Sequence, residues 1–292
     1  MRTSLCKWAF MVLLVMVATA CGGGSDTADT TNGTNTGSTN DLVALPEDTG
    51  GTHDAFLLGE TTADYGFYLY VPDGYADSGP AYPLLVFLHG AGEKGNSQTG
   101  GLTTLNKVLV NGPPKLIQNH TWDPPAPMLV ASPQCHDSGW NADKVHNFIQ
   151  YLLSSYNVNE QRIYLTGLSM GGGGTFAYCL AKGQEALVAA AVPICGWGNP
   201  PNAANMKHIP VWAFHGDADT TVYPSGSINM IDAINATNPP TRALLTIYPG
   251  VAHNSWARTY DGTGMGTESP DYDPFDMSIY AWLLNYKRPL ND

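Results

Sequence analysis

Basic residues are scarce in this chain. Thirteen Lys and Arg stand against 25 Asp and Glu, and the formal net charge is −12. Such a chain is repelled by nucleic-acid phosphates and by anionic lipid surfaces, which argues against both as partners. Cysteines are few as well, and Cys135, Cys179 and Cys195 lack the spacing of a metal site. We expect these three to be small buried residues, with at least one unpaired unless it pairs between chains.

The apolar stretch near the N-terminus, residues 8–17, is too short to span a membrane comfortably. It follows Arg2 and Lys7 and precedes small residues and Cys21, an order typical of an export signal with a cleavage site. The pattern resembles a bacterial lipoprotein signal, which implies removal of residues 1–20 and lipidation of Cys21. An ordinary cleaved secretory signal is the alternative.

Large apolar residues are absent from residues 22–40, which are nearly all Gly, Ser, Thr, Asn and Asp. Such a segment cannot bury enough surface to offset its ordering entropy. We therefore predict a flexible tether over residues 21–45 and one folded domain over 46–292. A lipid on Cys21 would anchor the exported protein to the bacterial envelope, in the periplasm or at the cell surface; without a lipid it would be secreted.

Apolar runs and helical periodicity alternate along the rest of the chain. Helical segments are expected near residues 141–156, 175–182, 228–234 and 277–286, of which the first has Asn141 as N-cap. Strands are expected at 67–71, 83–88, 128–131, 162–166, 187–194, 211–214 and 243–248. The first of these is expected to be antiparallel. The alternation predicts an α/β domain with a doubly wound, mostly parallel sheet, whose ligand site lies beyond the carboxyl ends of the strands.

The sequence Gly167-Leu168-Ser169-Met170-Gly171 lies between a predicted strand and a predicted helix. Strand, G-x-S-x-G and helix together are typical of a nucleophile elbow. Its glycines allow the sharp turn that exposes the serine hydroxyl at the end of the strand. We predict that Ser169 is a catalytic nucleophile.

A serine needs an adjacent base, and with this elbow the acid and then the histidine follow the serine along the chain. His208 precedes its strand and so lies at the wrong end of the sheet. His215 ends a strand directly, at the position where the acid is expected. His253 follows the last strand, and we predict that it is the base.

Two carboxylates follow the strand that ends at residue 214, and either is a candidate for the acid. Asp219 is far enough into the turn to reach the base, whereas Asp217 lies close to the strand end. We predict that Asp219 is the acid and that Asp217 is a loop residue that bonds its own backbone.

Acyl transfer also needs donors for an oxyanion. The backbone N–H of Met170, after the nucleophile, is one predicted donor. The second is expected in the glycine-rich loop 89–95, where Ala91 is preferred and Gly90 is the alternative. His89 precedes the serine in chain order, so we expect it to fix this loop rather than act as a base, and Glu93 to tie the loop in place.

These motifs together resemble those of α/β-hydrolase serine esterases, in particular bacterial carbohydrate-esterase-family-1-like and polyhydroxybutyrate-depolymerase-like enzymes. The resemblance covers roughly residues 60–288 and includes HGAGEKG at 89–95, NGPPKLI at 111–117, SPQC at 132–135, GLSMGG at 167–172, HGDAD at 215–219 and HNSW at 253–256. It implies an α/β-hydrolase fold, a single catalytic domain without a large lid, ester hydrolysis by Ser169, Asp219 and His253, and no metal or organic cofactor.

The substrate is less well defined by the sequence. Trp140, Trp197 and Trp256 each lie near a predicted strand end, where they would line an acyl or sugar pocket or else pack under loops. Carbohydrate esters (acetyl or feruloyl), polyesters and small esters all fit the motifs. The alternatives are a serine peptidase and a non-catalytic glycan-binding surface lipoprotein. No oligomeric state is indicated.

Overall fold

The computed structural model describes residues 39–290. The predicted signal 1–20, the predicted lipidation site Cys21 and most of the predicted tether lie outside the described residues. No helix within 39–290 is both long and apolar enough to cross a membrane.

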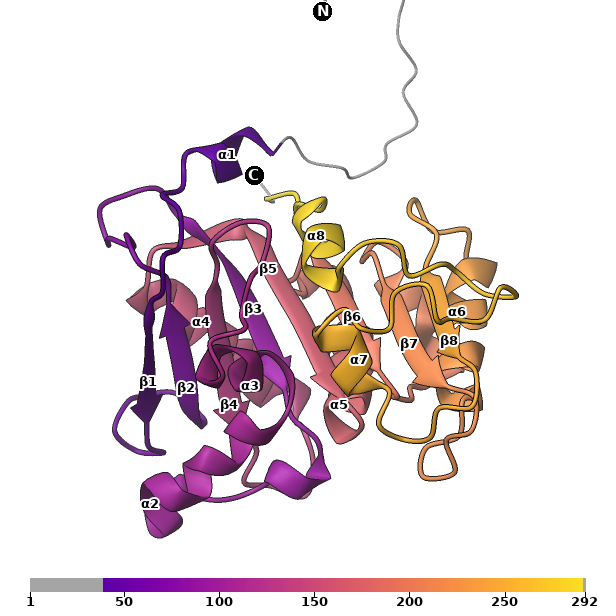
Figure 1. Cartoon of the computed structure of the whole chain (residues 1–292), viewed down its shortest axis with the longest axis horizontal. Coiled ribbons are helices and arrows are strands. Elements are labelled where there is room, and N and C mark those ends of the chain that lie inside the picture. The colour runs from indigo at the N-terminus through magenta and orange to yellow at the C-terminus, as the bar shows by residue number, and fades with distance from the viewer. Residues whose placement is uncertain (1–38, 291–292) are drawn as a thin grey trace, which may run out of the picture. The chain divides into compact units, whose positions relative to one another are not determined.

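One eight-stranded sheet forms the centre of the described part of the chain (Figure 1). Its strands are β1 (Thr52–Phe56), β2 (Gly66–Val71), β3 (Tyr82–Leu88), β4 (Leu129–Gln134), β5 (Val158–Leu168), β6 (Ala190–Ile194), β7 (Trp212–Gly216) and β8 (Leu244–Tyr248). Their order across the sheet is β1-β2-β4-β3-β5-β6-β7-β8. β1 and β2 pair antiparallel with each other, β2 pairs antiparallel with β4, and all other pairs are parallel. The predicted fold class is confirmed.

Helices cover both faces of this sheet (Figure 1). They are α1 (Asn40–Val43), α2 (Ser97–Leu105), α3 (Gly112–Gln118), α4 (Ala142–Ser155), α5 (Met170–Lys182), α6 (Ser225–Ala236), α7 (Trp256–Tyr260) and α8 (Ile279–Leu284). Alternate residues of β3 separate the two faces, because successive strand side chains point to opposite sides. Val86 and Leu88 belong to the core cluster that includes α4, α5 and α6. Phe87 belongs to the cluster that includes α3, α7 and α8.

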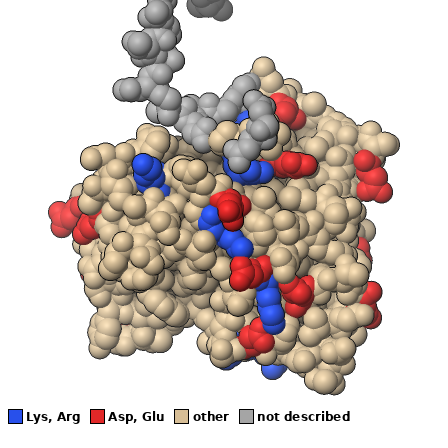
Figure 2. Space-filling model, turned by 180° about the vertical axis from the view of Figure 1, so that it is seen from behind, with Lys and Arg blue, Asp and Glu red and all other residues tan. Residues whose placement is uncertain are grey.

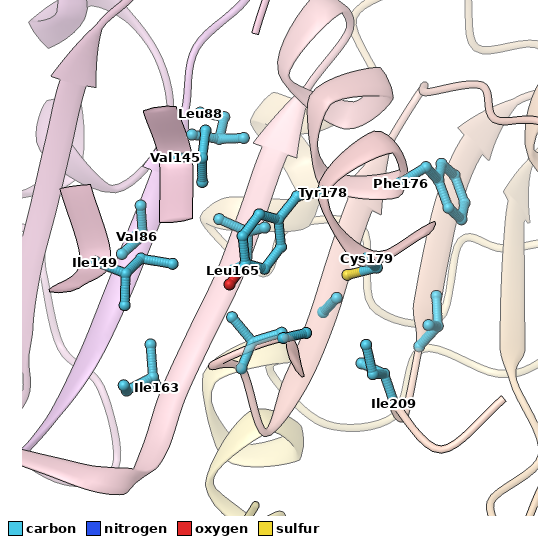
Figure 3. Packing of buried hydrophobic residues seen from close by; sticks show 14 of the residues in the cluster. Val86, Leu88, Val145, Ile149, Ile163, Leu165, Phe176, Tyr178, Cys179 and Ile209 are labelled. Carbon is cyan, nitrogen blue, oxygen red and sulfur yellow. The ribbon is translucent and has the colours of Figure 1, made fainter. Parts of the chain in front are cut away.

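The first of these clusters packs buried apolar side chains around the central strands (Figure 3). Val145 and Ile149 of α4 lie near Val86 and Leu88, and Ile163 and Leu165 of β5 lie in the same layer. Helix α4 forms where predicted, and the Asn141 side chain caps it by accepting from the N–H groups of Asp143 and Lys144. These rigid layers fix the carboxyl ends of β3, β5, β7 and β8.

Several elements differ from the sequence-based expectations. The strand β1 and helices α2, α3 and α7 were not predicted, and α8 is shorter than the 277–286 segment. Residues 39–45, at the end of the predicted tether, belong to the described part, where Asp41 pairs with the buried guanidinium of Arg162 at 2.8 Å. Helix α1 is therefore tied to the amino end of β5.

Candidate active site

Ser169 lies at the sharp turn between β5 and α5. Its backbone φ of 53° and ψ of −115° are outside the regions that residues with a side chain usually adopt. The turn requires glycine on both sides: a Cβ on Gly171 would lie 1.8 Å from the Leu88 carbonyl oxygen, and one on Gly167 would lie 2.4 Å from the Gly171 carbonyl oxygen. The Ser169 N–H donates to the carbonyl of Ile194 at 3.0 Å, which fixes the turn against β6.

The structure brings Ser169, His253 and Asp219 together. His253 Nε2 lies 2.8 Å from Ser169 Oγ, and His253 Nδ1 lies 2.7 Å from Asp219 Oδ2. Protonation of Nδ1 and a lone pair on Nε2 satisfy both bonds at once. The histidine side chain is 22% exposed, whereas that of Asp219 is fully buried. The arrangement can take the hydroxyl proton of Ser169 and stabilise the resulting imidazolium.

Asp219 is held as a carboxylate by hydrogen bonds. Burial favours its neutral form, but hydrogen bonds from His253 and from the backbone N–H groups of Val222 and Thr221 outweigh burial and lower the pKa of Asp219. The two N–H groups donate to Oδ1 at 3.0 and 2.8 Å. Oδ2 is thereby left for the histidine.

His215 contacts the carboxylate of Asp219 and makes no hydrogen bond to Ser169. Its Nε2 is 3.2 Å from Asp219 Oδ2 and 2.9 Å from the carbonyl of Val222, and its Nδ1 lies 2.7 Å from the Ser227 hydroxyl. Burial lowers the pKa of His215, so the ring is neutral and its Nε2–H can donate. The structure therefore places His215 as a support for the acid.

Asp217 is turned away from the base. Its Oδ1 accepts from the N–H of Gly250 at 2.6 Å, and its own N–H donates to the carbonyl of Tyr248. Asp217 thus ties the turn after β7 to the turn after β8, where the sequence predicted a bond to its own loop.

The loop after β3 is fixed by His89, which is completely buried. Its Nε2 accepts from the N–H of Cys135 at 2.9 Å, and its Nδ1–H donates to the carbonyl of Gly90 at 2.6 Å. Burial lowers the pKa of His89 to about 4, which keeps the ring neutral for both bonds. His89 thus holds its own loop against the end of β4.

Asn111, just before α3, links this loop to the loop that carries His253. Its Nδ2 donates to Glu93 Oε1 at 2.7 Å, and its Oδ1 accepts from Trp256 Nε1 at 3.0 Å. The Trp256 ring in turn stands edge-on to the His253 ring, with the ring centroids 5.3 Å apart. Sequence reasoning gave Asn111 no role, although the NGPPKLI motif begins at this residue.

A pocket of about 460 Å³ opens beside Ser169 and is lined by both predicted oxyanion donors, Met170 and Ala91. Met170 is the first residue of α5, and Ala91 is the first residue of a short 3-10 helix, Ala91–Glu93. The first N–H groups of a helix have no partner within it. Among the described residues neither N–H makes another hydrogen bond, so both are free to bind an oxyanion.

Two of the three predicted tryptophans line this pocket. Trp140 donates its Nε1–H to the carbonyl of His89 at 3.0 Å, which holds its ring in place. Trp197 is 46% exposed, and a Cβ on Gly173 would lie 3.1 Å from its ring. Trp256 is not among the residues that line the pocket, and it instead packs beside His253.

The three cysteines of the described part are free and buried. Cys195 lies directly after β6, and its sulfur accepts from the Ser169 N–H at 3.3 Å. Burial raises the pKa of its thiol to about 12, so it stays protonated. Within residues 39–290, no group of three or more His, Cys, Asp or Glu side chains has the arrangement of a metal site.

Comparison with known proteins points to esterases. The chain is 24% identical to acetylxylan esterase A from Aspergillus awamori over 201 residues, which cover 66% of this chain and 62% of that protein. It is 26% identical to a probable acetylxylan esterase A from Aspergillus terreus over 277 residues, covering 77% and 87% of the two chains. Among solved structures, a thermostable esterase matches with 28% identity and a TM-score of 0.59, covering 84% of this chain and 64% of that chain.

The matched regions thus span less than two thirds of the Aspergillus awamori protein and of the thermostable esterase. The family model described as the dienelactone hydrolase family matches residues 33–269, which is most of the chain. That region includes Ser169, Asp219 and His253. The chain belongs to the dienelactone hydrolase family.

Proposed function

We propose that this protein is a serine esterase that hydrolyses carboxylic esters, with esters of carbohydrates as its substrates. The observation that carries the proposal is the pair of bonds that join Ser169 Oγ to His253 and His253 to Asp219, beside an open pocket. The similarity to acetylxylan esterases supports the substrate class.

The reaction would proceed in two halves. His253 Nε2 takes the proton of Ser169 as Oγ attacks the ester carbonyl carbon, and the N–H groups of Met170 and Ala91 bind the oxyanion. His253 then gives this proton to the departing alcohol, which leaves the acyl group on Ser169. A water molecule gives a proton to His253 as it attacks the acyl carbon, and His253 then returns this proton to Ser169 Oγ as the acid leaves. Asp219 orients His253 throughout and stabilises the imidazolium each time it forms.

The shape of the surface next to Ser169 supports an extended substrate. A second pocket of about 600 Å³ shares Gly173, Ala177 and Trp197 with the first, and it is also lined by Asn199 and Asn202. The exposed indole of Trp197 therefore stands between two adjoining hollows. Aromatic faces and amide side chains suit sugar rings, which have an apolar face and a rim of hydroxyls.

We further propose that the enzyme is exported and anchored by a lipid on Cys21, with the following residues as a tether. The small residues before Cys21 and the Gly, Ser, Thr and Asn composition after it support this proposal. A Cys21→Ser variant should move from the membrane fraction to the soluble fraction. A wild-type protein that is already fully soluble would contradict the anchor.

The activity is tested by comparing wild type with Ser169→Ala on p-nitrophenyl acetate, acetylated xylan and a peptide amide. We expect ester turnover by the wild type and a loss of at least about a thousandfold in the variant. Ser138→Ala is the matched control, because Ser138 lines the same pocket. It should keep at least about a tenth of the activity. Ester turnover that survives Ser169→Ala would rule out the nucleophile, and preference for the peptide would rule out the esterase.

A further inference from the structure

Lys94 is the one charged residue among the described residues that line the pocket at Ser169. It follows the short helix that begins at Ala91, so it lies in the same loop as a predicted oxyanion donor. It is half-buried, and the rest of the lining is small, apolar or aromatic, including Trp140 and Trp197. A cation beside the reacting serine is notable in a chain with a net charge of −12.

Among residues 39–290, five of the eleven Lys and Arg side chains form an ion pair with an aspartate. Lys144 pairs with Asp137 at 2.6 Å, and Lys182 pairs with Asp143 at the same distance. On the face seen in Figure 2, several Lys and Arg side chains lie next to Asp and Glu side chains, and much of the surface is uncharged. Pairing of this kind leaves little net charge to attract a ligand.

Lys94 has no such partner. Within residues 39–290 its ammonium makes neither an ion pair nor a hydrogen bond. The adjacent carboxylate of Glu93 is buried and accepts from Asn111 on the other side of the loop. The positive charge of Lys94 is therefore available to a molecule in the pocket.

An unpaired ammonium that is partly shielded from water attracts an anion more strongly than a fully exposed one. The charge also discriminates, because it gives nothing to a neutral ligand of the same shape. We propose that Lys94 makes the site selective for esters that carry a carboxylate close to the scissile bond. This inference rests on the proposed esterase function and adds the charge of its substrate.

Such a carboxylate has two chemical sources. It belongs either to the alcohol part, as in an ester on a uronic-acid sugar, or to the acyl part, as in the half-ester of a dicarboxylic acid. Two matched pairs of substrates separate them. Acetylated methyl glucuronide is compared with acetylated methyl glucoside, and mono-4-nitrophenyl succinate is compared with 4-nitrophenyl pentanoate. The measured quantity is the ratio of kcat/KM for the anionic and the neutral member of each pair.

Three variants give the test its controls. Lys94→Met removes the charge and keeps much of the apolar stem, and Lys94→Arg keeps the charge. Lys207→Met removes an exposed charge just before β7, at the end of the sheet opposite to Ser169. Loss of one partly exposed charge contact is expected to change the ratio by about three- to tenfold.

For one of the pairs, the wild-type ratio should exceed that of Lys94→Met by this factor. The ratios for Lys94→Arg and Lys207→Met should stay near the wild-type ratio. Salt at about 0.5 M screens charges strongly, so it should reduce the difference between the wild-type and Lys94→Met ratios. Ratios that are equal in wild type and Lys94→Met for both pairs would overturn the inference, while turnover of the neutral esters would leave the esterase proposal standing. An enzyme inactive on all four esters would instead contradict both.

Discussion

Replacing Asp219 by asparagine should disable the base while leaving the fold intact. Asp219 Oδ1 accepts from two backbone N–H groups, those of Thr221 and Val222, and Oδ2 accepts from His253 Nδ1. An asparagine has one oxygen and one NH₂ for these two positions. The two backbone N–H groups can only donate, whereas His253 can change its tautomer, so the oxygen stays on the N–H groups and the NH₂ turns toward the histidine. His253 must then present a lone pair at Nδ1 and carry its proton on Nε2.

That tautomer is the wrong one for catalysis, because Nε2–H cannot accept the proton of Ser169. The equivalent change in another serine hydrolase lowers kcat by about 10⁴-fold, which corresponds to about 5.5 kcal/mol of transition-state stabilisation. We expect a loss of this order in kcat for p-nitrophenyl acetate, with a much smaller change in KM. The thermal unfolding midpoint should change little, since the bonds to the backbone are retained.

Asp217→Asn is the matched control. Asp217 Oδ1 accepts from Gly250 N–H, and an asparagine oxygen can accept the same bond. Its kcat should stay within about threefold of the wild type. A tenfold or smaller loss in Asp219→Asn, or a larger loss in Asp217→Asn, would refute the assignment of the acid.

Three further changes probe other parts of the structure. Asp41→Asn should cost about 2 kcal/mol of unfolding free energy in urea at pH 7, because it leaves Arg162 buried without its carboxylate. Burial alone would raise the pKa of Asp41, but the hydrogen bond from Arg162 and the other interactions with basic neighbours together outweigh burial, so the pKa is lowered. The stabilisation by Asp41 is therefore present above a pH of about 4 and should diminish as the pH falls below it. Gly171→Ala should lower the free energy of unfolding by more than about 3 kcal/mol, because its Cβ would lie 1.8 Å from a backbone oxygen. Gly92→Ala is the control, because a Cβ there has nothing within 4 Å, and it should unfold at close to the wild-type temperature. Cys195 should resist iodoacetamide in native protein at pH 8, as judged by mass spectrometry, because burial raises its thiol pKa to about 12; rapid native labelling would contradict this.

The central sheet could be predicted because its strands are continuous apolar runs covered on both faces. The strand β1 could not, since Thr52–Phe56 is a partly exposed edge strand with mixed polarity and carries no such pattern. Helices α2 and α3 were equally hidden. Their segments contain glycines and prolines, and Gly101 within α2 has a φ of 60°, so the local sequence does not favour a regular helix.

The residues of the candidate site were also predictable only in part. Ser169, Asp219 and His253 could be ranked because chain order and strand ends restrict the choice. The structure places His253 within hydrogen-bonding distance of both Ser169 and Asp219. Trp256 could not be placed, because whether a tryptophan faces a pocket or a neighbouring loop depends on contacts remote in sequence. Its partner Asn111 is 145 residues away.

That remote contact also explains how separate loops can act as one site. The loop 89–95 and the loop that carries His253 follow different strands, β3 and β8, and a residue outside both loops joins them. Asn111 bonds to Glu93 in the first loop and to Trp256 beside His253 in the second. A donor and an acceptor on a single amide thus link the loop that contains Ala91 to the loop that contains His253. Because catalysis depends on preorganised geometry, the side chains that hold these loops matter to the site as well as those that would contact the substrate.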